Sequence, residues 1–221
     1  MADIPALPKR FRLDVRLPQA VPAHGFRHPV DAEIPALGRL MWDAYRGTPD
    51  EKDVGDSVAS ATEEVRLTFS GAYGTFLPAA SFVADDGSRP VAAALVTALE
   101  AVPLLAFVFT APSHVSRGLG RRLIEGVMHA LGKQGCPTLV LAVTEDNIRA
   151  RRLYESMGFT PHPQAVMGSG GASVPEIHSD NRDQRESVLT CASQCRRGRI
   201  QTPSRQADRP SRIFESYRAA L

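Results

Sequence analysis

The chain has 221 residues, of which 43% are hydrophobic, and a formal net charge of +2. This length and apolar content fit one globular domain with appendages, and the near-neutral charge makes nucleic-acid binding an unfavoured function. The N-terminal sequence MADIPALPKRFRLDVR lacks the apolar stretch of a signal peptide, so we expect a cytoplasmic protein.

The first half of the chain predicts one strand, two helices and three further strands. Apolar and charged residues alternate over 11–17, which indicates a half-buried strand. Apolar residues at helical spacing follow from about 31 to 44 and from 58 to 69, separated by the polar loop GTPDEKDVGD. Strands are expected at about 80–84, 91–98 and 104–110, with a hairpin turn after the first of them.

The segment 90–112 is the most membrane-like part of the chain. Its length would admit a spanning helix, but Glu100 and Pro103 lie in its middle and it is rich in Val and Phe. Two buried strands joined by a turn explain it better, and we expect no membrane association.

The second half predicts a helix, a strand and a short helix. Leu119, Leu123, Val127 and Leu131 share one helix face. The near-continuous apolar run 138–144 indicates a strand that is buried on both faces. A helix capped by Asp146 or Asn147 then runs to a stop at Gly158. The order of elements predicts an α/β domain.

The segment HVSRGLGRR, residues 114–122, joins a strand to a helix. Backbone N–H groups at a helix start favour an anion, and glycines allow a pyrophosphate to come close to the backbone. Leu123 occupies the third glycine position of a dinucleotide-binding fingerprint, and no Gly-Lys-Ser/Thr follows, so neither classical motif fits. A glycine turn before a solvated basic helix end is the alternative.

Two segments resemble the GNAT superfamily of N-acetyltransferases. PSHVSRGLGRRL is similar to the acetyl-CoA loop of that family, Arg/Gln-x-x-Gly-x-Gly/Ala. LAVTEDNIRARRLYESMGF resembles its next motif, Asn-x-x-Ala-x-x-Leu-Tyr-x-x-x-Gly-Phe, from Asn147 to Phe159. The resemblance implies a mixed central sheet flanked by helices, and acetyl-CoA as cosubstrate.

The resemblance also implies roles for individual residues. Asn147 would bond the cosubstrate near its pantetheine arm, and Tyr154 would be the general acid that protonates the departing CoA thiolate. A phenol is protonated at neutral pH and a thiolate is a comparably basic leaving group, although a packed core tyrosine is the alternative. The expected cofactor-binding residues also include Val108, Phe109, Thr110, Val115, Ser116, Arg117, Gly118, Leu119, Gly120 and Arg121.

The amine substrate must lose a proton before it attacks. Glu145 is the preferred candidate for this base and Glu100 the second, acting directly or through water, although both could simply be solvated. His114 is interpreted as a loop residue. Metal binding is not expected, because Cys191 and Cys195 form a single Cys-x-x-x-Cys pair without a second motif.

The chain departs from the family pattern in two places. Val115 stands at the Arg/Gln position of the loop, and after Phe159 only residues 164–167 could form one of the strands that normally complete the fold. We therefore expect an acetyltransferase domain over 1–167 and a basic, low-complexity, disordered tail over 168–221.

The leading functional prediction is N-acetyl transfer from acetyl-CoA to a primary amine of a small molecule or peptide, with a homodimer as one option. A CoA-binding module without turnover, in which the C-terminal part of the fold is incomplete, is the second. A structural domain without a ligand is the third.

Overall fold

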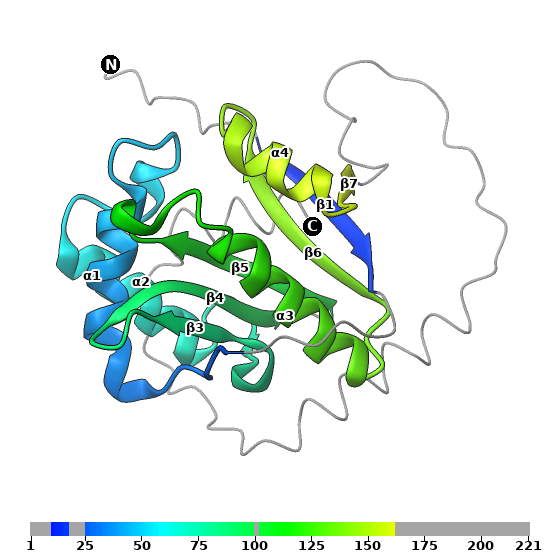
Figure 1. Ribbon diagram of the computed structural model, residues 1–221, viewed down its shortest axis with the longest axis horizontal. Helices are drawn as coiled ribbons and strands as arrows, with labels where there is room; N and C mark the ends of the chain where they lie inside the picture. Colours follow the sequence, from blue (N-terminus) through cyan, green and yellow to red (C-terminus); the bar gives the residue numbers. More distant parts are fainter. Residues whose placement is uncertain (1–9, 18–24, 100–101, 162–221) are drawn as a thin grey trace, which may run out of the picture.

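The computed structural model describes residues 10–17, 25–99 and 102–161 (Figure 1). The predicted tail 168–221, the short segment 164–167, Glu100 and the Cys191/Cys195 pair lie outside the described residues.

The described part of the chain forms a mixed sheet of seven strands with four α-helices. The strand order is β2-β4-β5-β6-β1-β7, with β3 also paired to β4, and all pairs are antiparallel except β5 with β6. The strands are β1 (Arg10–Arg16), β2 (Thr75–Phe76), β3 (Phe82–Asp85), β4 (Pro90–Leu99), β5 (Val102–Thr110), β6 (Thr138–Thr144) and β7 (Thr160–Pro161). The helices are α1 (Ile34–Tyr45), α2 (Val58–Ser70), α3 (Leu119–Lys133) and α4 (Ile148–Ser156). The predicted α/β class and the mixed, helix-flanked sheet are confirmed.

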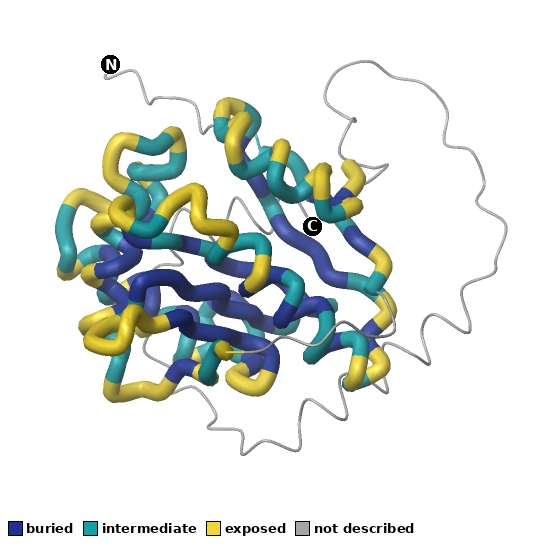
Figure 2. The backbone as a smooth tube through the Cα atoms, in the orientation of Figure 1, coloured by how far each residue is buried: buried dark blue, intermediate teal, exposed yellow. Residues whose placement is uncertain are grey.

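Helices cover the centre of the sheet. In Figure 1, α3 crosses in front of β4 and β5, and it packs against β3, β4 and β5, whereas α1 packs against α2, β4 and β5. Residues 91–97 of β4 are all buried, as expected for a strand covered on both faces (Figure 2). Residues 90–99 and 102–110 therefore form two core strands, and none of the helices in the described ranges is long and apolar enough to cross a membrane.

Strand β1 has an unexpected neighbour. It pairs along its whole length with β6, from Arg10 opposite Thr144 to Arg16 opposite Thr138, and its other edge receives β7 at Leu13 and Asp14. The N-terminal strand thus lies between two strands of the C-terminal half of the domain. Among the described residues, the strand that follows Phe159 is the two-residue β7, which the sequence did not predict, while the expected strand 164–167 lies outside them.

The sheet opens between β5 and β6. These parallel strands are in register only where Leu104 lies opposite Val140, near the start of β5, and they then diverge toward their carboxyl ends (Figure 1). A bulge in β5 lies just beyond this point, because Leu95 and Val96 of β4 face Phe107 and Leu105 and leave Ala106 as an extra residue. A bulge bends its strand, so it favours this separation.

Candidate active site

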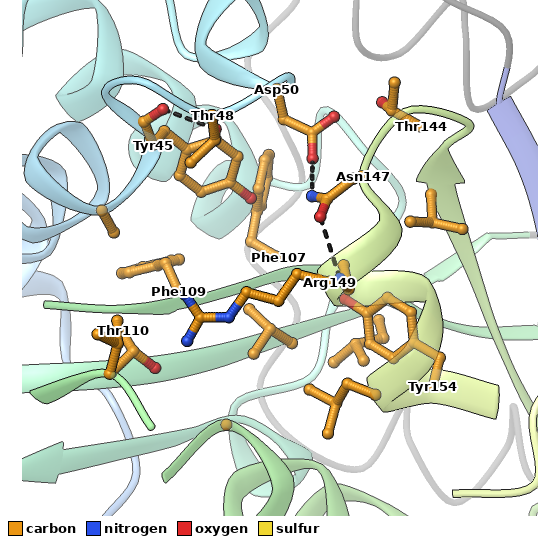
Figure 3. A pocket seen from close by; sticks show the side chains of 18 of the residues that line it. Tyr45, Thr48, Asp50, Phe107, Phe109, Thr110, Thr144, Asn147, Arg149 and Tyr154 are labelled. Carbon is orange, nitrogen blue, oxygen red and sulfur yellow. Dashed lines mark hydrogen bonds between the residues drawn. The ribbon is translucent and has the colours of Figure 1, made fainter. Parts of the chain in front are cut away.

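The divergence of β5 and β6 opens a cavity of about 510 Å³ (Figure 3). Most of its wall comes from the second half of β5, the end of β6, the loop and first turn of α3, and α4 from its cap to Tyr154. The α1–α2 loop and the first residue of β1 close it on a further side. Four stretches that are far apart in the sequence, at residues 10, 44–53, 105–121 and 142–154, therefore meet at one opening.

The loop before α3 has the backbone shape of an anion site. Ser116 has φ 63° and Gly118 has φ 75°, and α3 starts directly after Gly118 at Leu119. Left-handed residues in such a loop turn successive N–H groups toward a common concavity, and the first turn of a helix adds N–H groups without intrahelical acceptors. Val115, at the position of the missing Arg or Gln side chain, is 37% exposed. Backbone groups suited to a pyrophosphate are therefore present without that side chain.

Gly120 faces the cavity. A Cβ atom at this position would meet Leu153 Cδ2 and Val108 Cγ1 at 3.9 Å and Thr110 Oγ1 at 4.0 Å, and all three residues line the cavity. The fold has room for a small side chain here, but that side chain would project into the opening between α4 and β5.

Most of the residues predicted from the sequence lie together around this cavity. Val108, Phe109 and Thr110 pair with β4 on one side, and they line the cavity beyond the point where β6 has turned away. The lining also includes Val115, Ser116, Gly118, Leu119, Gly120, Arg121, Asn147 and Tyr154. Arg117 and Glu145 are not among the lining residues, and the carbonyl of Glu145 accepts a 3.3 Å hydrogen bond from Arg151.

Asn147 caps α4 and reaches a second segment. Its Oδ1 accepts a 3.0 Å hydrogen bond from the N–H of Ala150, as an N-cap side chain should. Its Nδ2 donates a 2.6 Å hydrogen bond to Oδ2 of Asp50 in the α1–α2 loop (Figure 3). The residue predicted as the cap therefore also links α4 to the α1–α2 loop by a hydrogen bond across the cavity.

Tyr154 lies one turn before the end of α4. Its ring packs edge-to-face on Phe159, with the ring centroids 5.7 Å apart, and its side chain lines the cavity. Burial and, to a smaller extent, the negative charge of Asp50 raise the pKa of the phenol well above its usual value. The phenol of Tyr154 therefore stays protonated at physiological pH.

Several lining residues were not predicted from the sequence. These are Arg10 of β1, Tyr45 at the end of α1, Thr48, Asp50 and Asp53 of the α1–α2 loop, and Arg149 of α4. Figure 3 shows the side chain of Arg149 extending from α4 toward β5. No periodicity or motif marks the loop 47–56, and only its concentration of acidic residues could have drawn attention to it.

Arg10 and Asp53 form an ion pair at the edge of the cavity, with side chains that are only 7% and 17% exposed. Burial raises the pKa of Asp53 to about 6, the nearby charge of Asp50 adds to this, and Arg10 opposes it. The described residues contain no group of three His, Cys, Asp or Glu side chains that could hold a metal ion.

Known proteins resemble both the sequence and the fold. A ribosomal protein bS18-alanine N-acetyltransferase from Salmonella typhimurium is 37% identical over 92 residues, which are 42% of this chain and 61% of that protein. A mycothiol acetyltransferase from Thermomonospora curvata is 46% identical over 56 residues, 25% of this chain and 19% of the relative. The chain thus spans less than two thirds of either relative.

Among solved structures, a GCN5-related N-acetyltransferase from Sphaerobacter thermophilus has a TM-score of 0.54 at 18% identity, over 71% of this chain and 50% of that one. At this identity the likeness concerns the fold alone. A family model described as the acetyltransferase (GNAT) family matches residues 37–159, which include the glycine loop, α4 and most of the cavity wall. This chain is therefore a member of the GNAT acetyltransferase family.

Proposed function

We propose that this protein transfers the acetyl group of acetyl-CoA to a primary amine of a small molecule or a peptide. The observation that carries the proposal is the convergence of the glycine loop before α3 and the Tyr154 phenol on one cavity between diverging strands. The relatives are named as enzymes that act on a ribosomal protein alanine and on mycothiol, which supports both acceptor classes.

The backbone of this chain would hold the acetyl donor along the cavity. The N–H groups of residues 115–120 would bind its pyrophosphate, with the guanidinium of Arg121 beside them. Arg121 is fixed by a 2.5 Å hydrogen bond from its Nη2 to Ser156 Oγ, which joins the start of α3 to the end of α4. The edge of β5 at Val108, Phe109 and Thr110 would pair with the amides of the pantetheine arm.

Tyr154 would act when the thioester bond breaks. The amine nitrogen adds to the acetyl carbonyl, the C–S bond breaks as the intermediate collapses, and the phenol of Tyr154 gives its proton to the leaving sulfur. A phenol that stays protonated at neutral pH has the state that this step requires. Glu145 remains a candidate base through water, although it does not line the cavity.

A CoA-binding module without turnover is the second candidate function, because only the two-residue β7 follows α4 in the described part of the chain. The two functions separate in one experiment, in which a panel of amines is incubated with acetyl-CoA and free thiol is detected. Thiol release with an amine supports transfer. A CoA-dependent rise in melting temperature without thiol release supports the binding module. If the protein shows no thiol release and no rise in melting temperature, both candidate functions are wrong.

A further inference from the structure

We propose that Asp50, in the loop between α1 and α2, receives the ammonium group of the acceptor and takes up the proton that the amine must lose. The proposal rests on the acetyl transfer proposed above, and it names both the base and the acceptor class. The acceptor would then bind on the side of the cavity that is formed by the α1–α2 loop, a segment without any sequence motif.

The two carboxylate oxygens of Asp50 have different surroundings. Oδ2 accepts the 2.6 Å hydrogen bond from Asn147 Nδ2, so its position is fixed by the cap of α4. Oδ1 is buried and accepts no hydrogen bond within the described part of the chain, although the residue lines the cavity. A buried carboxylate oxygen without a donor is unfavourable, and a ligand N–H would relieve this. The geometry therefore leaves one oxygen for a ligand that donates hydrogen bonds.

The neighbouring charges leave Asp50 as the carboxylate suited to a cation. The second acid of the loop, Asp53, is already paired with the buried guanidinium of Arg10. Asp50 and Tyr154 line the same cavity, and the charge of Asp50 contributes to the raised pKa of the phenol, so an amine bound at Asp50 shares this cavity with the proposed acid. The other titratable groups that line the cavity are Tyr45, His114, Arg121 and Arg149.

The proton balance of the reaction fits two groups in these positions. A primary ammonium carries three protons. The first passes to Oδ1 of Asp50 and then to solvent, which frees the nitrogen lone pair to form the new C–N bond. The second leaves the nitrogen as the C–S bond breaks, and it replaces on Tyr154 the proton that the phenol gives to the CoA sulfur. The third stays on the product amide.

The position of Asp50 selects a chemical class of acceptor. A carboxylate favours amines that are protonated at neutral pH, such as a peptide α-amino group or an alkyl diamine. The same carboxylate has no comparable electrostatic attraction for an acceptor that is a hydroxyl group or an uncharged arylamine. We therefore expect acceptors to be cationic primary amines.

The test compares four variants with the unchanged 221-residue chain: Asp50→Asn, Asp50→Glu, Glu145→Gln and Asp31→Asn. Asp50→Asn keeps the shape and an oxygen that can accept the bond from Asn147, but it removes the charge and the base. Glu145→Gln removes the other candidate base, and Asp31→Asn is a matched control at an exposed position outside the cavity. The acceptors are a short peptide with a free α-amino group and 1,4-diaminobutane. Thiol release gives kcat/KM across pH 5 to 9, and calorimetry gives the affinity for CoA.

We expect Asp50→Asn to lower kcat/KM for both amines by on the order of 10² to 10⁴, the usual contribution of a positioned acid or base. The acidic limb of the pH profile should weaken, while the affinity for CoA stays within about threefold because backbone groups make most of the expected contacts. Asp50→Glu, which restores a carboxylate, should recover more activity than Asp50→Asn. Asp31→Asn should behave like the unchanged protein, and Glu145→Gln should lose less kcat/KM than Asp50→Asn.

Two different results separate this inference from the proposed function. If the unchanged protein transfers acetyl groups and Asp50→Asn keeps both its rate and its pH profile, Asp50 is not the base, and acetyl transfer still stands. A large loss in Glu145→Gln with none in Asp50→Asn would assign the base to Glu145 instead. If the unchanged protein releases no thiol with any amine, acetyl transfer itself fails, and this inference fails with it.

Discussion

Asn147 Nδ2 donates a 2.6 Å hydrogen bond to Asp50 Oδ2, across 97 positions of the sequence. The same side chain accepts the N–H of Ala150 at 3.0 Å and so begins α4. One amide therefore satisfies a helix terminus with its oxygen and fixes a loop carboxylate with its nitrogen. The helix that carries Tyr154 and the loop that carries Asp50 are held at a set separation by this residue.

Replacement of Asn147 by Ala should remove both interactions. The loss of an N-cap costs about 1 kcal/mol, and the loss of the hydrogen bond to the partly buried Asp50 carboxylate adds about 1 to 2 kcal/mol. Asn147→Ser can still accept the N–H of Ala150 but is too short to reach Asp50, so it should restore only the cap. Denaturant titration of the unchanged protein and both variants measures this, and an Asn147→Ser protein as stable as the unchanged one would show that the bond to Asp50 contributes nothing.

Tyr154→Phe should separate catalysis from packing. The ring keeps its edge-to-face contact with Phe159, so we expect a change in the free energy of unfolding below about 1 kcal/mol. The proton donor is lost, and turnover should fall by roughly one to three decades, because water can act as a weaker acid. Turnover at saturation and the affinity for acetyl-CoA are measured on the same variant. Full turnover would remove Tyr154 as the acid.

Gly120→Val should abolish CoA binding while the domain stays folded. A Cβ atom fits beside Leu153 and Val108, and the two methyl groups beyond it would occupy the opening that the pyrophosphate must enter. The cost of valine in the first turn of a helix is below about 1 kcal/mol relative to alanine. Glu125→Val, on the same helix but outside the cavity lining, is the control for that cost. If calorimetry finds unchanged CoA affinity in Gly120→Val, the loop is not the binding site.

Asp53 should make stability depend on pH in an unusual direction. Its pKa is raised from an ordinary value of 3.8 to about 6 in the folded chain, chiefly by burial. Between these pH values the folded state binds more protons than the unfolded state, so the free energy of unfolding falls as pH rises. The contribution of Asp53 to the free energy of unfolding is fully present below about pH 4 and is lost by about pH 6. It amounts to at most about 3 kcal/mol.

The variant Asp53→Asn isolates this contribution, because other groups titrate over the same range. Thermal unfolding of both proteins from pH 4 to pH 7 should show a smaller decline in the variant. Parallel curves would mean that Asp53 has no raised pKa. A steeper decline in the variant would mean that the ion pair with Arg10 outweighs burial and lowers the pKa of Asp53.

The sequence by itself determined the local structure and the parts of the site that short motifs encode. Alternation of apolar residues predicted β1, and helical spacing predicted α3 and α4, because these periods report which face of an element is buried. The glycine loop and the stretch from Asn147 to Phe159 were recognisable because each performs its function within about ten residues of continuous chain.

The tertiary structure alone decided that β1 lies between β6 and β7, where it brings Arg10 to the cavity. It also decided that β5 and β6 separate beyond Leu104 and Val140, and that the loop with Asp50 lines the same cavity as Tyr154. The physical reason is that the apolar pattern of a strand shows how deeply the strand is buried but does not specify which strand pairs with it. A charged loop residue belongs to no periodic pattern, so its partner is determined only when distant segments pack together.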